Sequence, residues 1–155
     1  MAKTAHPMNS PDSKRIDQED SGARILLAED TEEMRAVVAL RLRQQGYCVT
    51  ECCNGAELIA ELKDYMGNVP AEARKRKFDL IISDIRMPGV FGLSVVEGGS
   101  EYRNFPPTIL ITAFGDEETH ERARQFGVAA VLDKPFDMND LLGKVRDALA
   151  GAASA

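Results

Sequence analysis

Carboxylate side chains that could hold a metal ion follow two separate apolar runs of this sequence. Glu29 and Asp30 come directly after residues 24–28, and Asp84 comes directly after the run 78–83. If the two runs are neighbouring strands, the three carboxylates lie close together and repel one another unless a cation or a proton joins them. Oxygen ligands without histidine or thiolate favour a hard ion, and a shallow site that keeps water suits Mg²⁺ better than Ca²⁺.

Asp84 is also a candidate nucleophile, because a carboxylate can attack a phosphoryl donor and form an acyl phosphate. Thr112, which ends another apolar run, would supply a hydroxyl donor, and Lys134, which follows a further one, would supply a positive charge. Both groups suit the binding of phosphoryl oxygens. Ala113 is small enough to leave space beside Thr112. These residues predict phosphoryl transfer to Asp84 with the help of Mg²⁺.

Each of these motifs also has a simpler interpretation. The acidic pair could merely begin a helix, because Asp30 or Thr31 can cap its first turn. Thr112 could be an ordinary strand-end residue, and Lys134-Pro135 could belong to an ordinary loop. The motifs nevertheless occur in one order, each at the carboxyl end of an apolar run, and this combination favours a functional site.

The elements that must position these residues alternate along the chain. Short apolar runs predict strands and amphipathic stretches between them predict helices, which together indicate an α/β fold with a parallel sheet covered on both faces. Ligands of such sheets bind beyond the carboxyl ends of the strands, where the polar groups collect. The five predicted strands cover residues 24–28, 47–51, 78–83, 108–112 and 129–132.

Five helices are predicted, and glycines mark the ends of three of them. Gly46 and Gly127 each follow a helix and precede a strand, where a left-handed cap residue is favourable. Gly98-Gly99 interrupts the third helix, which is therefore expected to be short. The predicted helices cover residues 32–45, 55–66, 92–97, 117–126 and 138–150.

The chain is expected to form one domain behind a flexible leader. Residues 1–23 are polar and lack apolar periodicity, so the folded domain is expected over 24–150, with a short tail at 151–155. The leader lacks the apolar core of a signal peptide, and no apolar run is long enough to span a bilayer. Cys48, Cys52 and Cys53 are too clustered for a disulfide framework and are expected to be buried strand thiols. We therefore expect a cytoplasmic protein without membrane contact.

The composition, with 44% hydrophobic and 28% charged residues, is typical of an ordinary folded domain. A formal net charge of −6 repels polyanions, so no direct DNA binding is expected. The basic run over residues 74–77 is interpreted as a solvated surface segment.

Four motifs together resemble the receiver domain of bacterial response regulators, the CheY-like domains. The resemblance covers about residues 24–150. It implies the flavodoxin-like fold of that family, a doubly wound, five-stranded parallel sheet with five helices. The motifs are Leu26-Leu27-Ala28-Glu29-Asp30, Asp84-Ile85-Arg86-Met87-Pro88-Gly89, Thr112-Ala113 and Lys134-Pro135-Phe136.

The resemblance implies a role for each matching acidic residue. Asp84 is the phosphoacceptor, and Mg²⁺ is held by the carboxylates of Asp30 and Asp84 together with the main-chain carbonyl of Arg86. Glu29 assists through water. Glu29 replaces the aspartate that is commoner in the family, which preserves the charge on a longer arm.

The resemblance also implies how the phosphoryl group is sensed. Thr112, with Ala113 beside it, contacts the group, and Lys134 pairs with it; the Lys134-Pro135 peptide bond is expected to be cis. Many relatives carry an aromatic switch residue where this chain has Val131, so the usual ring movement is not expected here.

Two further departures bear on the lifetime and the partners of the signal. Arg86 and Phe114 match positions that in the family influence how water reaches phosphorus, and their long and bulky side chains predict slow self-dephosphorylation. The segment 67–77 is longer than the family usually has, which suggests a role in docking a particular partner.

Because six residues follow Leu149, the sequence is expected to act as a stand-alone receiver whose phosphorylated surface is its output. A sensor histidine kinase or a histidine phosphotransfer protein would supply the phosphoryl group. A downstream protein would bind the surface formed by the helix expected over 117–126, the strand over 129–132 and the helix over 138–150. A phosphorylation-dependent homodimer is a further alternative. No enzyme activity beyond its own phosphoryl acceptance and loss is expected.

Two rival functions are weighed against this one. The first is an interaction module of the same fold that works without phosphorylation. The second is a Mg²⁺-dependent phosphohydrolase, which commonly has a second aspartate two residues after the nucleophile, where this chain has Arg86.

Overall fold

A computed structural model of the chain describes residues 22–66, 77–87, 90–99, 101–102, 104–113 and 115–153. Most of the predicted leader, residues 67–76 of the long segment and Phe114 lie outside these described residues. Within the described part, the elements begin at Arg24 and end at Ala153.

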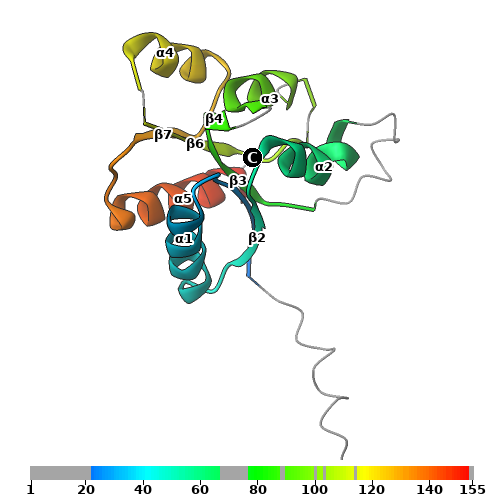
Figure 1. Cartoon of the computed structure of the whole chain (residues 1–155). Coiled ribbons are helices and arrows are strands. Elements are labelled where there is room, and N and C mark those ends of the chain that lie inside the picture. Colours follow the sequence, from blue (N-terminus) through cyan, green and yellow to red (C-terminus); the bar gives the residue numbers. More distant parts are fainter. Residues whose placement is uncertain are drawn as a thin grey trace, which may run out of the picture.

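The central sheet consists of five parallel strands, β1 (Arg24–Ala28), β2 (Cys48–Cys52), β3 (Leu80–Asp84), β6 (Thr108–Thr112) and β7 (Ala130–Asp133) (Figure 1). Their order across the sheet is β2-β1-β3-β6-β7, in which the direction of winding reverses beside β1, as in flavodoxin-like folds. Strands β3 and β6 are buried along their whole length, because helices cover both faces of the middle of the sheet.

Five helices of the described residues cover this sheet, α1 (Glu32–Gln44), α2 (Gly55–Met66), α3 (Gly92–Gly99), α4 (Glu117–Gln125) and α5 (Met138–Ala153). Helices α1 and α5 pack on one face, and α2, α3 and α4 lie on the other (Figure 1). Neighbouring residues of one strand point to opposite faces of the sheet. Leu27 packs with Leu42 of α1 and Leu141 of α5, whereas Leu26 packs with Leu58 of α2. The predicted α/β fold, a doubly wound five-stranded parallel sheet with five helices, is confirmed.

Two local predictions from the sequence are also confirmed. Gly46 and Gly127 have positive φ angles of 91° and 74°, in the region where glycine is favoured, and each lies between a helix and a strand. The Lys134-Pro135 peptide bond is cis.

The third helix and the segment before it differ from prediction. Helix α3 continues through Gly98 and Gly99, so the prediction that these glycines interrupt it was wrong. A short antiparallel pair, β4 (Arg86–Met87) and β5 (Val90–Phe91), precedes α3 and was not predicted from the sequence. Strand β3 also extends to Asp84, one residue further than predicted.

Among the described residues, no helix has the combined length and apolarity needed to cross a membrane.

The two glycines of α3 predict opposite effects of alanine. Gly98→Ala should raise the free energy of unfolding by about 0.5–1 kcal/mol, because alanine favours the helix and its Cβ would meet nothing within 4 Å. Gly99→Ala should lower it by about 1–3 kcal/mol, because a Cβ there would lie 2.5 Å from the Phe105 ring. Urea denaturation measures both variants, and an equal effect of the two would contradict this packing.

Candidate functional site

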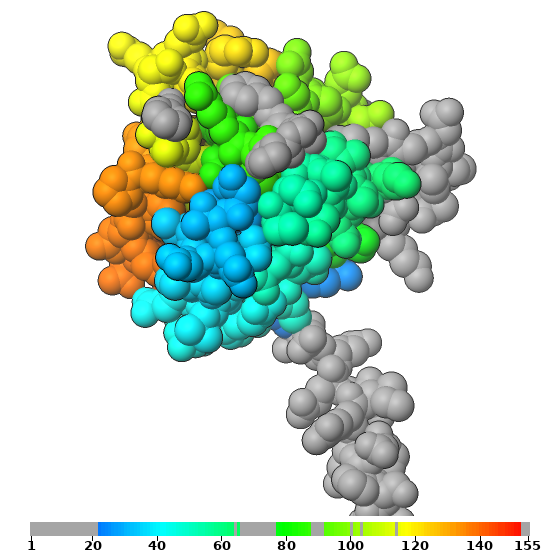
Figure 2. Space-filling model, viewed as in Figure 1, coloured from blue at the N-terminus to red at the C-terminus, as the bar shows by residue number. Residues whose placement is uncertain are grey.

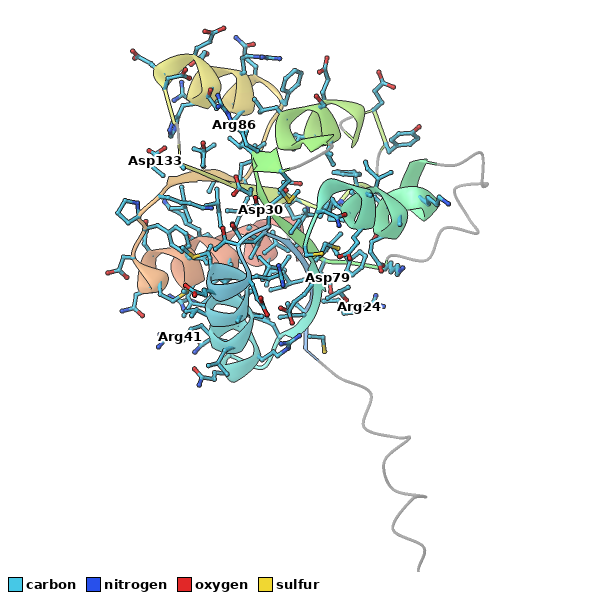
Figure 3. The ribbon with its side chains drawn as sticks, in the orientation of Figure 1. Arg24, Asp30, Arg41, Asp79, Arg86 and Asp133 are labelled. Carbon is cyan, nitrogen blue, oxygen red and sulfur yellow. The ribbon has the colours of Figure 1, made fainter. Side chains whose placement is uncertain are left out.

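The candidate site lies at the carboxyl ends of the strands, as predicted. Glu29 follows β1, Asp84 ends β3 and Lys134 follows β7. Figure 3 shows Asp30 and Asp133 at this same edge of the sheet. In the space-filling view, α1 (blue) is bordered by α2 and by the stretch from β7 to α5 (orange), so distant parts of the sequence meet on this side of the molecule (Figure 2).

One ammonium group joins two of the carboxylates. Lys134 Nζ donates to Asp84 Oδ2 at 2.8 Å and lies 3.0 and 3.1 Å from the two carboxylate oxygens of Glu29. The Glu29 and Asp84 side chains are buried, and the Lys134 side chain is 18% exposed. Charged hydrogen bonds of this kind are stronger than neutral ones, and partial burial reduces the screening by water.

The pKa values of Glu29 and Lys134 reflect this crowded arrangement. Burial raises the pKa of Glu29, and the nearby charge of Asp84 adds to the rise, while the ammonium of Lys134 opposes it. Burial by itself would lower the pKa of Lys134, but the hydrogen bonds to Asp84 and Glu29 outweigh this effect and raise it. Lys134 is therefore held in its charged form by the acidic residues around it.

The donor set fits a hard divalent cation. One carboxylate oxygen from each of Glu29, Asp30 and Asp84 lies within 4.8 Å of the others, and Asp30 is exposed to solvent. Oxygen donors with access to water suit Mg²⁺, which keeps several of its waters when bound to protein. The three predicted carboxylates are therefore brought together in the described part of the chain.

The backbone of Glu29 is fixed from two sides. Its N–H donates to the carbonyl of Cys52 at 3.1 Å, and its carbonyl accepts from Arg35 Nη1 at 2.9 Å. The N–H of Thr31 donates to Glu29 Oε1 at 3.2 Å, and Thr31, the N-cap of α1, makes no side-chain capping bond. The loop at Glu29 is thus shaped mainly by its contacts to α1 and β2.

Arg35 is a residue of this site that was not predicted from the sequence. It stands one turn into α1, so helical spacing could have placed it near the loop after β1. Its partners are the Glu29 carbonyl, which accepts a hydrogen bond, and the Glu51 carboxylate, which forms an ion pair at 3.6 Å. They are not visible in the sequence, because they depend on the pairing of β1 with β2.

The chain after Asp84 turns tightly beneath the site. The N–H of Arg86 donates to Asp84 Oδ1 at 3.1 Å, and the N–H of Gly92 donates to the carbonyl of Ile85 at 2.6 Å. A Cβ at Gly92 would lie 2.9 Å from the carbonyl oxygen of Asp84, so this close approach requires glycine. Arg86 therefore lies beside Asp84, and a metal-binding role of its carbonyl stays a prediction.

The remaining predicted switch residues lie on β6 and β7. Thr112 is buried, and its carbonyl accepts from the N–H of Lys134 at 2.7 Å. Ala113 is exposed. Val131 is half-buried and packs against the cluster that includes Leu110 of β6 and Ala123 of α4. The backbone thus links Thr112 directly to Lys134, and the roles proposed for these side chains stay predictions.

The cysteines differ in exposure, which partly corrects the prediction of buried strand thiols. Cys52 is buried at the end of β2, and mainly because of this burial its pKa rises to about 12. Cys48 is half-buried, whereas Cys53 is exposed and follows the strand. The Cys53 thiol donates to Glu57 Oε1 at 3.2 Å, and this hydrogen bond raises its pKa.

Comparison with known proteins gives one consistent family. The family model of the response regulator receiver domain matches residues 25–146. Among curated proteins, the transcriptional regulatory protein PdtaR of Mycobacterium tuberculosis is 34% identical over 119 residues, which cover 77% of this chain and 53% of PdtaR. The transcriptional regulatory protein GlrR of Escherichia coli is 32% identical over 133 residues, which cover 86% of this chain and 28% of GlrR. The chain thus spans about half or less of these relatives.

Solved structures agree with this result. The chemotaxis response regulator CheY4 of Vibrio cholerae matches with a TM-score of 0.66 and 27% identity, covering 83% of this chain and 99% of that chain. A CheY-like receiver domain protein from Methanospirillum hungatei matches with a TM-score of 0.72 and 24% identity, covering 86% of this chain and 98% of that chain. The second likeness shows the fold alone.

Removal of the shared ammonium should destabilise the fold. Lys134→Met leaves the acceptors of Glu29 and Asp84 without their donor, and we expect the free energy of unfolding to fall by about 1–3 kcal/mol. Saturating Mg²⁺ should reverse part of this loss, because the metal supplies positive charge to the same carboxylates. Urea denaturation in EDTA and in Mg²⁺ measures both effects, with Lys144→Met in α5 as the matched control. A loss no greater than that of the control would contradict the importance of this ion pair.

Proposed function

Because this chain belongs to the response regulator receiver domain family, we propose that it accepts a phosphoryl group on Asp84. The donor is a phosphohistidine of a sensor histidine kinase or of a histidine phosphotransfer protein. The observation that carries this proposal is the position of Lys134 Nζ, 2.8 Å from Asp84 Oδ2, within a cluster of carboxylates suited to Mg²⁺. This arrangement combines a nucleophile with the positive charge that a phosphoryl group requires.

The proposed transfer exchanges one bond to phosphorus for another. A carboxylate oxygen of Asp84 attacks phosphorus and forms a P–O bond, while the P–N bond to the donor imidazole breaks and the imidazole takes up a proton. Bound Mg²⁺ would neutralise charge on the transferring oxygens. Asp30, Asp84 and the main-chain carbonyl of Arg86 would hold the ion, with Glu29 acting through water.

Lys134 and Thr112 are proposed to register the new group. Once Asp84 is phosphorylated, the phosphoryl oxygens would become the stronger partners of the Lys134 ammonium, which would weaken its contact with Glu29. The Thr112 hydroxyl would donate to the same group, with Ala113 leaving room beside it. The bond between the Lys134 N–H and the Thr112 carbonyl supports a shared response of the two residues.

The output is proposed to be protein binding. The surface formed by α4, β7 and α5 would contact a downstream target, directly or through a phosphorylation-dependent homodimer. Strand β7 lies at an edge of the sheet, which leaves one side of this surface open. The net charge of −6 supports a protein partner over DNA.

Slow self-dephosphorylation is part of the same proposal, and no activity on other substrates is proposed. Arg86 is exposed beside Asp84, and its guanidinium offers no acid or carbonyl group to orient an attacking water. The shielding assigned to Phe114 falls on a residue outside the described part of the chain.

Asp84→Asn should abolish phosphoryl acceptance, because an amide does not attack phosphorus. After incubation with acetyl phosphate and Mg²⁺, intact mass should show one added phosphoryl group on the wild type and none on the variant. The matched control is Asp79→Asn, since Asp79 precedes β3 at the opposite edge and accepts from the Arg24 N–H at 2.8 Å.

Three results would contradict the phosphoacceptor assignment. Equal labelling of Asp84→Asn and wild type would place the acceptor elsewhere. Steady release of phosphate without an adduct would indicate a phosphohydrolase. A wild type that stays unlabelled by acetyl phosphate and by phosphohistidine donors would indicate an interaction module independent of phosphorylation.

Asp30→Ala should weaken Mg²⁺ binding at least about tenfold, because it removes one of the charged ligands. Titration of the amide shifts around Asp84 with Mg²⁺ measures this affinity in the absence of any phosphoryl donor. Glu33→Ala, which removes an exposed carboxylate from the first turn of α1, is the control. Labelling that persists in EDTA would argue against a metal requirement.

A further inference from the structure

A histidine–aspartate pair connects the first turn of α4 to the end of β7. His120 Nε2 lies 2.9 Å from Asp133 Oδ1, and because the carboxylate accepts, the ring nitrogen carries the proton of this bond. Figure 3 shows Asp133 near α4, at the edge of the sheet where Asp30 also lies. The pair therefore spans two elements that the proposed function places in the output surface.

Gly115, which precedes α4, lies directly against this pair. A Cβ at position 115 would lie 1.7 Å from Asp133 Oδ1 and 2.8 Å from His120 Nε2. Any side chain at this position would thus displace the pair. The absence of a side chain at Gly115 allows α4 and β7 to approach closely enough for the contact to form.

Asp133 is joined through the backbone to the candidate phosphoacceptor site. It pairs in register with Thr112 across β6 and β7, and it directly precedes Lys134. The N–H of Lys134 donates to the Thr112 carbonyl at 2.7 Å, and its ammonium contacts Asp84. A displacement of Lys134 toward a phosphoryl group would therefore act on Asp133, and through it on His120.

Helix α4 is lightly anchored, so one polar contact can influence its position. Of its nine residues only Ala123 is buried. Asp116 caps the helix by accepting from the N–H of Thr119 at 2.8 Å, but this bond lies within the helix start and does not tie it to the sheet. Elements with few buried contacts shift more readily than the core.

We propose that His120 is a positioning residue, and that its contact with Asp133 transmits the phosphorylation of Asp84 to α4. This inference rests on the proposed function. The pair is partly exposed, with side-chain exposures of 30% and 55%, and exposed pairs contribute little to stability. The pair should therefore change the relative populations of two positions of α4, and it should change the free energy of unfolding only slightly.

The test follows α4 in the full chain with and without phosphorylation. Amide shifts of residues 117–125 are compared with those around Asp84 before and after addition of acetyl phosphate and Mg²⁺, and intact mass gives the labelled fraction.

His120→Ala and Asp133→Ala remove the contact, and Gly115→Ala displaces it while keeping both side chains. His120→Gln is the conservative variant, because its amide can still donate to Asp133. Glu121→Gln is the control, since Glu121 pairs with Arg124 and not with β7.

We expect all variants to accept the phosphoryl group as the wild type does. In the wild type, phosphorylation should change the ratio of the two α4 positions. In the three disrupting variants this change should be about two- to fivefold smaller. His120→Gln should recover much of the response, and Glu121→Gln should retain it. The role of the pair would be overturned if the disrupting variants showed the same α4 response as the wild type, or if Glu121→Gln lost the response as much as they do. Either result would leave the proposed function untouched. Absence of a wild-type adduct would overturn the proposed function as well.

Discussion

The loops around the candidate site are arranged to offset the free-energy cost of bringing charged carboxylates together at the edge of a buried sheet. Glu29 and Asp84 are both buried, and a single ammonium, that of Lys134, lies between them. Unpaired buried charges are strongly unfavourable, so the loops that carry these residues must hold them within hydrogen-bonding distance. Three sets of hydrogen bonds meet this requirement. They are the two bonds to the Glu29 main chain, the bond from the Arg86 N–H to Asp84, and the bond from the Lys134 N–H to the Thr112 carbonyl.

The fold and the charged residues at the strand ends could be predicted from the sequence, because both follow from order along the chain, whereas the contact of Arg35 with the Glu29 carbonyl could not. Parallel strands place their carboxyl ends at one edge, so the positions of Glu29, Asp84 and Lys134 after apolar runs were enough to assign them to one place. The direct contact of Lys134 with Glu29 could not be predicted, since it depends on side-chain reach across β1, β3 and β7. The continuation of α3 through Gly98 and Gly99 was not predicted either, because the close approach of the Phe105 ring to Gly99 cannot be read from the sequence.

Helix α4 is held less firmly by the core than helices α1 and α5 are. On one face α1 and α5 share a core with strands β1, β3, β6 and β7. On the other face α4 contributes one buried residue, Ala123, to a smaller cluster. A site whose residues lie on the rigid sheet, beside a helix with few buried contacts, can change the position of that helix without disturbing the core. This asymmetry gives the α4 side of the domain the greater freedom to respond.

The unequal exposure of the cysteines gives the domain a selective position for chemical labelling. Cys52 is buried and its thiol has a pKa of about 12, and Cys48 is half-buried, whereas Cys53 is exposed, so a thiol-reactive fluorophore would attach preferentially at Cys53. The elevated pKa of Cys53 calls for a mildly alkaline reaction. The carbonyl of the preceding residue, Cys52, accepts from the N–H of Glu29. A dye at Cys53 would therefore be attached one residue from the main-chain contact between β2 and the loop that carries Glu29.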